Sequence, residues 1–231
     1  MPRKSKLLPE TDVKITRNLA KSFLIWNLSI MIILYILTNI VLIGHKMTIL
    51  GKSEILKLQR QFRILWPFND RLLDGDGYIL TVNQSVVLNY LEHKNLTSKE
   101  IVMLPTNIVA HLTAKSRFGR LGLSFLNAAK VHSGFIGKLA LEVVNLSNER
   151  TPITIKRNDP FMHIEFIQRS GEPEPYDGEY QFQFMTEYEI KEALPYIRNI
   201  MPDFSTYWEK IKKRSKALGK TKLSSLLTDN T

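Results

Sequence analysis

The sequence predicts a mainly β domain of the distorted jelly-roll or β-barrel kind, preceded by one transmembrane helix and followed by a C-terminal helix and a basic tail. From Tyr78 onward, short runs rich in β-branched residues recur at intervals of roughly ten residues, which is typical of closed or sandwiched antiparallel sheets. Before them, residues 23–43 form an apolar run without a charge. The expected parts are a basic N-terminal segment (1–22), the transmembrane helix (23–43), an amphipathic connector (44–76), the β domain (77–184) and a C-terminal helix with a basic tail (185–231).

The composition narrows the functional classes. The chain of 231 residues carries a net charge of +10 and has no cysteine. A strongly basic chain favours an anionic partner, such as a phosphorylated ligand, nucleic acid or anionic lipid. The absence of cysteine excludes disulfides, thiolate nucleophiles and Cys-ligated zinc, and therefore also the zinc-dependent nucleotide deaminases. The sequence contains no Walker loop, GxGxxG or HExxH motif, so it offers no standard metal or phosphate fingerprint.

The run from Phe23 to Ile43 (FLIWNLSIMIILYILTNIVLI) has the length of a membrane-spanning helix. At 1.5 Å per residue it would extend about 31 Å, which matches the hydrocarbon core of a bilayer. It is too long for a signal-peptide core, and the alternative is a buried core helix. Basic residues flank both ends, so charge assigns no orientation. A nucleotide-dependent function would require a single-pass protein whose β domain faces the cytoplasm.

Residues 47–66 carry apolar side chains at helical spacing. Ile55, Leu58, Phe62 and Leu65 follow one another at intervals of three, four and three residues, with basic residues between them. Two placements are open for this helix: on the membrane surface, or packed on the domain as a connector. We expect Pro67 to end the helix and residues 74–77 (DGDG) to form a turn.

The β domain is predicted from short apolar runs separated by turn residues. The runs are YILTV (78–82), SVVLNYLE (85–92), EIVML (100–104), NIVAHLTA (107–114), LALEVVN (139–145), PITIKR (152–157) and PFMHIEFIQ (160–168). Asn-Gln, Asn-Leu-Thr-Ser (95–98) and Pro-Thr-Asn divide the first four of them. Residues 170–184 are rich in Gly, Pro, Glu and Tyr, which predicts a loop or tail.

The C-terminal region is expected to hold a helix from Thr186 to Ile200, interrupted near Pro195, and then a basic tail. Seven Lys or Arg residues lie between Lys210 and Lys222. Such a tail either attracts anionic lipid or is simply a solvated charged segment. Nucleic acid is disfavoured as a partner because no aromatic platform accompanies the tail.

Two features of residues 114–145 suggest chemistry. Lys115, Ser116, Arg117 and Arg120 form a basic and hydroxyl cluster of the kind that binds phosphates. Glu142 is a lone carboxylate inside an apolar strand. Burial would raise its pKa and suit it to move protons. The alternatives are an ion-paired structural glutamate and solvated basic residues at the rim of the barrel.

Three blocks give the chain a family resemblance. They are LPTNIVAHLTAKSRFGRLGL (104–123), GFIGKLALEVVN (134–145) and PYDGEYQFQ (175–183). In this order and spacing they resemble the dCTP deaminase and dUTPase superfamily, nearer the dCTP deaminase branch. The resemblance covers residues 77–184 and implies a dUTPase-like β fold that assembles as a homotrimer, with sites built between subunits.

The resemblance also implies roles for individual residues. Glu142 matches the general base, while Ser116 and Arg120 match residues that hold the attacking water and the glutamate. Phosphate-side and sugar-side contacts would come from Lys115, Ser116, Arg117, Arg120, His132, Tyr176 and Gln183. The implied reaction is a hydrolytic deamination of dCTP without a metal at the reaction centre, in which Mg²⁺ only accompanies the triphosphate.

The sequence departs from the family pattern at several positions. His132 and Ser133 stand where the family has Asp and Pro, and Glu179 replaces a lysine of the closing block. The family's early Ser-Tyr-Asp-x-Arg-x-Gly strand has no match. The leading interpretation is therefore a membrane-anchored dCTP deaminase-like protein. A non-catalytic nucleotide-binding or signalling module and a dUTP pyrophosphatase are the alternatives.

Overall fold

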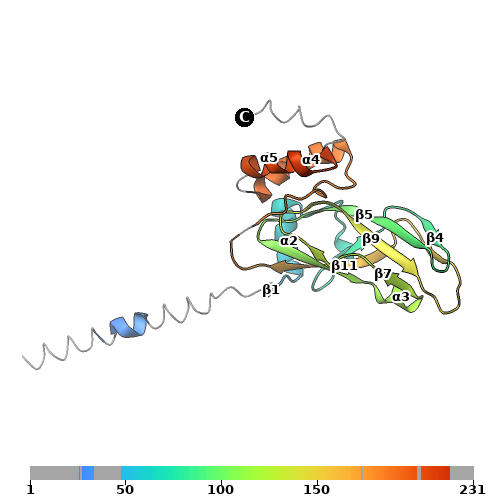
Figure 1. Ribbon diagram of the computed structural model, residues 1–231. Helices are drawn as coiled ribbons and strands as arrows, with labels where there is room; N and C mark the ends of the chain where they lie inside the picture. The colour runs from blue at the N-terminus through green and yellow to red at the C-terminus, as the bar shows by residue number, and fades with distance from the viewer. Residues whose placement is uncertain (1–25, 27, 34–47, 173, 202–203, 219–231) are drawn as a thin grey trace, which may run out of the picture. The chain divides into compact units, whose positions relative to one another are not determined.

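A computed structural model describes residues 26, 28–33, 48–172, 174–201 and 204–218 (Figure 1). The chain divides into two compact units, Met1–Lys46 and Met47–Thr231. In the first unit, Trp26 and residues 28–33 are helical. The rest of the predicted transmembrane run 23–43 lies outside the described residues. In the described part of the chain, no helix is both long and apolar enough to cross a bilayer.

The second unit is mainly β with helices after the sheets, as the sequence predicts. Its strands are β1 (Thr48–Ile49), β2 (Leu65–Trp66), β3 (Tyr78–Thr81), β4 (Val86–Leu88), β5 (His93–Met103), β6 (Ile108–Ala114), β7 (Leu123–Phe125), β8 (Lys130–Val131), β9 (Ile136–Asn145), β10 (Ile153–Ile155) and β11 (Pro160–Gln168). Its helices are α2 (Lys52–Phe62), the 3₁₀ turn η1 (Asp70–Leu72), α3 (Ser116–Arg120), α4 (Glu187–Ile200) and α5 (Phe204–Arg214).

Antiparallel pairing arranges these strands in two larger sheets and one small pair. One sheet has the order β1-β11-β6-β8, with β3 also paired to β11, and the other has the order β2-β5-β9-β7. β4 and β10 form the small pair. Alternating residues of both larger sheets, among them Leu141 of β9 and Phe166 of β11, are buried in one shared core. The sheets therefore bury their apolar faces against each other, as in a β-sandwich.

The expected divider Asn95–Ser98 is not a turn. These residues belong to β5, which begins at His93 and pairs with β9 from His93↔Val144 to Met103↔Ile136. Asn95, Leu96 and Thr97 pair regularly with β9, and the register shifts only after Thr97, so the bulge that holds Ser98 does not end the strand. The buried Ser98 hydroxyl donates to the Glu100 carbonyl at 2.7 Å and accepts from the Leu139 amide at 2.8 Å. Polar residues that look like turn signals are thus satisfied inside the sheet.

The segment predicted as a connector is part of the β domain. β1 pairs with β11, and β2 pairs with β5. α2 lies between them and buries Ile55 completely in the core, which supports the packed placement of this helix. It ends at Phe62, with Arg63 as a left-handed cap, so the helix stops before Pro67. The compact unit accordingly begins at Met47 and not at residue 77.

The C-terminal region is also more structured than predicted. α4 begins after Thr186, whose hydroxyl forms a capping box with Glu189, and it runs through Pro195 without interruption. The apolar face of α4, which includes Ile190 and Ile197, is buried against β5 and β9 residues, and this packing outweighs the hydrogen bond that proline removes. The first part of the predicted basic tail is the helix α5, and it packs Trp208 and Ile211 into the same cluster.

Among the described residues, Glu100 is the carboxylate that the fold buries, with 2% exposure. Thr81 donates its backbone N–H to Glu100 Oε2 at 2.9 Å and its hydroxyl to Oε1 at 2.8 Å. Burial raises the pKa of Glu100 above its ordinary value of 4.5, although the hydrogen bonds from Thr81 oppose this shift. An ionised Glu100 is therefore less stable in the folded state than in the unfolded chain.

We expect Glu100→Gln to remove a pH-dependent loss of stability. The amide keeps an oxygen for the Thr81 N–H and gains an NH₂ group that donates to the Thr81 hydroxyl. Because the folded pKa lies above the unfolded one, wild type loses stability as the pH rises from 4.5 through the folded pKa. The free energy of unfolding of the variant relative to wild type should therefore rise across this window, measured by urea denaturation from about pH 4 to about pH 8.

Glu192→Gln on α4 is the matched control, because this carboxyl group is exposed. The control should follow the pH dependence of wild type. A difference between Glu100→Gln and wild type that stays constant over the whole pH range would contradict the raised pKa.

Candidate functional site

Strand β9 places the Glu142 carboxylate on the face opposite the core. Leu141 and Val143 are buried, while Glu142 between them is half-buried. Its strand partner in β5 is Asn95, and its carbonyl accepts from the Leu126 amide at 2.9 Å. The sequence suggested a buried carboxylate, and within one chain this is wrong. The alternation that buries the flanking residues turns Glu142 toward a pocket.

This pocket has a volume of about 560 Å³, which suits a small molecule. Four of the predicted site residues line it: His132, Glu142, Tyr176 and Gln183. The structure therefore brings together positions that lie far apart in the sequence, from His132 to Gln183. A carboxylate, an imidazole, a phenol and an amide in one hollow provide both hydrogen-bond donors and acceptors.

The pocket also has polar residues that were not identified from the sequence. They are Asn95, Asn127, Lys130 and Tyr180. Lys130 lies two positions before His132 around the buried Val131. In a strand, residues on either side of a buried residue point to the same face. The apolar Val131 between Lys130 and His132 was therefore the sequence signal that these two residues share one face. Lys130 gives the pocket a cation that the predicted set lacked there.

His132 stacks on Tyr176, with ring centroids 5.6 Å apart and an interplanar angle of 24°. Although the residue is exposed overall, the stacked ring is partly shielded from solvent. This shielding, and secondarily the nearby Lys130 ammonium, lowers the pKa of His132 below its ordinary value of 6.5. The imidazole is therefore neutral at pH 7 and can donate one hydrogen bond and accept another.

The segment after β11 forms the outer wall of the pocket. Tyr176 N–H donates to the Ser133 carbonyl at 2.8 Å, which holds the segment beside the turn that precedes β9. Gly134 in this turn has φ 71°, and a Cβ atom there would lie 2.5 Å from the Pro175 side chain. The glycine is therefore required both by its backbone conformation and by the close approach of the wall.

The basic cluster lies on the short helix α3 and not on a strand. Lys115 is its N-cap residue, and Phe118 is the buried anchor of the helix. Arg117 lies 3.6 Å from Asp159 and stacks over the Phe118 ring. Ser116 and Arg120 are exposed. The helix thus presents hydroxyl and guanidinium groups to the outside of the domain.

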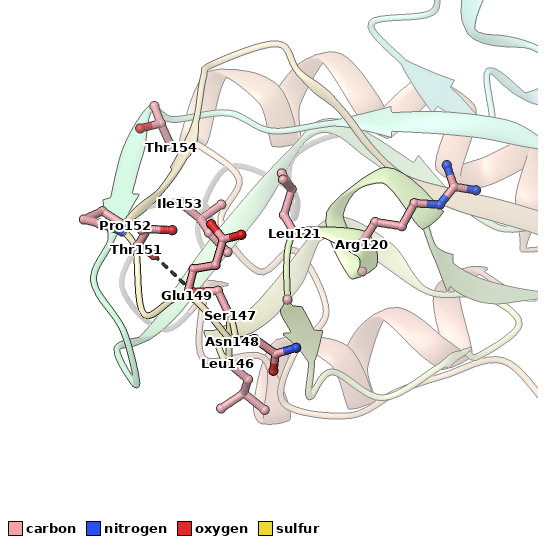
Figure 2. Close-up of a pocket in the computed structure, with 12 residues that line it drawn as sticks. Arg120, Leu121, Leu146, Ser147, Asn148, Glu149, Thr151, Pro152, Ile153 and Thr154 are labelled. Atoms are coloured by element: carbon pink, nitrogen blue, oxygen red, sulfur yellow. Dashed lines mark hydrogen bonds between the residues drawn. The ribbon is translucent and has the colours of Figure 1, made fainter.

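Arg120 lines a second pocket of about 550 Å³, whose other walls come from residues 119–122, 146–149 and 151–154. Figure 2 shows the Arg120 side chain extending away from the other labelled residues, and the Ser147 hydroxyl donating to the Thr151 carbonyl. None of the residues around this second pocket lines the Glu142 pocket. Within a single chain, the predicted catalytic residues therefore do not meet. Glu142 lies in one pocket, while Arg120 lies at another.

The fold and the first pocket define a mainly antiparallel β domain with a carboxylate-bearing small-molecule site. Residues 45–169, more than half of the chain, match the model of the family described as dCTP deaminase-like. The chain belongs to this family. The match begins well before residue 77 and ends before the block 175–183, so the third predicted block lies beyond it.

The chain is also similar to proteins of archaea and their viruses. It is 35% identical over 120 residues to a dCTP deaminase of Sulfurisphaera tokodaii, covering 49% of this chain and 63% of that protein. It is 31% identical over 132 residues to a dCTP deaminase of Saccharolobus solfataricus, covering 57% of this chain and 68% of that protein. A probable deoxyuridine 5′-triphosphate nucleotidohydrolase of Sulfolobus islandicus rod-shaped virus 1 is 34% identical over 110 residues, covering 47% and 62%. The chain thus spans less than two thirds of the Sulfurisphaera relative.

Proposed function

We propose that the chain deaminates a deoxycytidine nucleotide, dCTP, by metal-independent hydrolysis. The observation that carries the proposal is Glu142, which β9 places in a pocket with His132, Lys130, Tyr176 and Gln183. Membership of the dCTP deaminase-like family and relatives named dCTP deaminase support the choice of substrate.

In this proposal Glu142 is the general base. It takes a proton from water while the water oxygen adds to C4 of the cytosine, and it returns a proton to the ring nitrogen. The C4–N bond then breaks, ammonia leaves and a uracil nucleotide remains. Mg²⁺ accompanies the triphosphate and is part of the substrate. The neutral His132 imidazole is available for a sugar hydroxyl, and Tyr176 and Gln183 complete the wall.

The separation of Arg120 from Glu142 favours a site built between copies of the chain. We propose a homotrimer in which α3 of one copy brings Ser116 and Arg120 to the Glu142 pocket of the next, with Lys115 and Arg117 toward the phosphates. Leu121 and Leu146 beside Arg120 are 55% and 48% exposed. Apolar side chains exposed at this position are suited to burial in an interface between subunits.

Two other functions remain as alternatives, each with an observation in its favour. Glu142 is only half-buried in one chain, which favours a module that binds nucleotides without catalysis. The viral relative is named as a probable dUTP hydrolase, which favours a pyrophosphatase acting on dUTP. The products formed from dCTP and dUTP distinguish these functions from deamination.

We also propose that residues 23–43 anchor the protein in a membrane as a single span, with the β domain in the cytoplasm. The support is the charge-free run in the sequence and the need of a nucleotide-dependent domain for cytoplasmic dNTPs. The amphipathic α2 packs on the domain, so the anchor would consist of the apolar run alone.

Glu142→Gln should abolish deamination while leaving nucleotide binding intact, because the amide keeps the shape but cannot accept the proton. Loss of a general base lowers turnover by about 10²–10⁴-fold. The assay follows uracil nucleotide and ammonia released from dCTP, with dUTP tested in parallel. Glu165→Gln is the matched control, since Glu165 is a half-buried strand carboxylate outside the Glu142 pocket. Near-normal turnover by Glu142→Gln would exclude the mechanism, and binding without turnover by wild type would support the non-catalytic module.

Mixing two inactive variants tests the shared site. Glu142→Gln and Arg120→Ala should each be inactive as pure proteins. When equal amounts are unfolded and refolded together, about one quarter of the sites in random trimers combine a native Glu142 with a native Arg120 from a neighbour. The mixture should therefore recover about a quarter of wild-type activity. A mixture that stays inactive, or a monomer in light scattering, would contradict the trimeric site.

Removing residues 1–46 should release the protein from membranes into the soluble fraction, because the compact unit starting at Met47 lacks the apolar run. Ultracentrifugation of lysates with and without detergent checks this result. Full-length protein that is soluble without detergent would overturn the anchor.

A further inference from the structure

The outer wall of the Glu142 pocket is made by the closing segment, which we define as residues 175–185. It contributes Tyr176, Tyr180, Gln183 and Phe184 to the pocket lining. The segment contains turns but no strand or regular helix. Its conformation therefore depends on contacts with the elements on either side of it.

Two phenylalanines of the closing segment have left-handed backbone conformations. Phe182 has φ 62° and Phe184 has φ 57°, values at which a bulky residue crowds its own backbone. They flank Gln183, which lines the pocket together with Phe184. Backbone strain of this kind persists only when surrounding contacts hold it.

The sheet holds one side of the segment. Phe182 N–H donates to the Ile136 carbonyl at 2.7 Å, and the Gln183 carbonyl accepts from the Lys138 N–H at 3.1 Å. Both partners lie at the start of β9, the strand that carries Glu142. Phe182 and Gln183 are thus tied to the strand of the proposed base.

The helix α5 and the turn that follows it hold the other side. The buried Ser215 hydroxyl donates to the Gln181 carbonyl at 2.6 Å, and the Lys216 N–H donates to the Glu179 carbonyl at 3.0 Å. The Phe182 ring is buried against Trp208 of α5, with centroids 6.2 Å apart. These holding residues lie beyond the part of the chain that matches the family model.

The helices are themselves fastened to the sheet. Lys138 of β9 is buried and donates to Glu189 of α4 at 2.7 Å. The other Glu189 carboxylate oxygen caps α4 by accepting from the Thr186 N–H at 2.8 Å. Removing Glu189 would leave the charge of the buried Lys138 uncompensated, which is costly. The closing segment is therefore held between two parts of one rigid arrangement.

We propose that α4, α5 and the turn after α5 (residues 215–218) are a positioning device, in which Ser215 and Trp208 hold Gln183 and Phe184 in place before a nucleotide arrives. The wall of the pocket is then preformed and does not need to order around the ligand. A preformed wall raises the fraction of binding-competent protein and lowers the apparent dissociation constant accordingly. The identity of the ligand rests on the proposed function, whereas the holding of the segment does not.

Hydrogen exchange on the full-length chain without nucleotide tests the holding. In Ser215→Ala, the amides of residues 181–185 should exchange about fivefold faster or more, because one hydrogen bond that holds the strained segment is lost. Ser215→Thr keeps the hydroxyl and should restore wild-type protection. Ser205→Ala, the same change at an exposed position of α5, should match wild type. Equal exchange in Ser215→Ala and wild type would overturn the proposal.

Calorimetry with dCTP tests the consequence for the pocket, using Glu142→Gln as the parent so that no turnover occurs. Adding Ser215→Ala should raise the dissociation constant about fivefold, and Ser215→Thr should reverse this. Faster exchange with unchanged affinity would overturn the positioning role and leave Ser215 with a purely structural one. If the parent binds no nucleotide, the proposed function is wrong, and the exchange data alone decide whether the helices hold the segment.

Discussion

The Gln181 side chain is the interaction on which the pocket depends. It is fully buried, and its oxygen accepts from the Ile136 N–H at 2.7 Å. Its NH₂ group donates to the Gly134 carbonyl at 2.7 Å and to the Tyr176 carbonyl at 2.8 Å. One amide thus joins the turn before β9, the start of β9 and the closing segment. Because a buried amide is costly to leave unpaired, these three pieces are held in one relative geometry, and that geometry sets the position of Tyr176 against His132.

Strand β9 places the Glu142 carboxylate in the pocket that the Gln181 contacts shape. Its buried residues fix the register with β5, and the same alternation turns Glu142 outward. A slip of one residue would bury Glu142 and expose Leu141, so the core itself specifies where the carboxylate lies. The half-burial of Glu142 and the distant position of Arg120 have a common explanation in the proposed trimer, in which a neighbouring copy both covers the carboxylate and supplies the cation.

The sequence was sufficient to predict strands where a single hydrophobic periodicity dominated a segment. β6 and β11 fall within their predicted runs, β9 begins three residues before its run, and Glu142, His132, Tyr176 and Gln183 line one pocket. The sequence was insufficient where contacts between distant segments decided the secondary structure. Asn95–Ser98 stay in β5 because partners in β9 and the core satisfy them, and Pro195 stays helical because α4 packs on the sheets. The helix α3 depends on the burial of Phe118, a contact that no local pattern reveals.

Some of the basic residues that contribute to the net charge of +10 form ion pairs in the structure. In the C-terminal region, Lys212 pairs with Glu209, Arg214 with Asp177 and Lys216 with Glu179. Two of these three pairs, Arg214–Asp177 and Lys216–Glu179, join the C-terminal region to the closing segment. Glu179, which stands where the family has a lysine, forms an ion pair with Lys216. The carboxylate that stands at this position of the closing segment therefore has a cationic partner within the same chain.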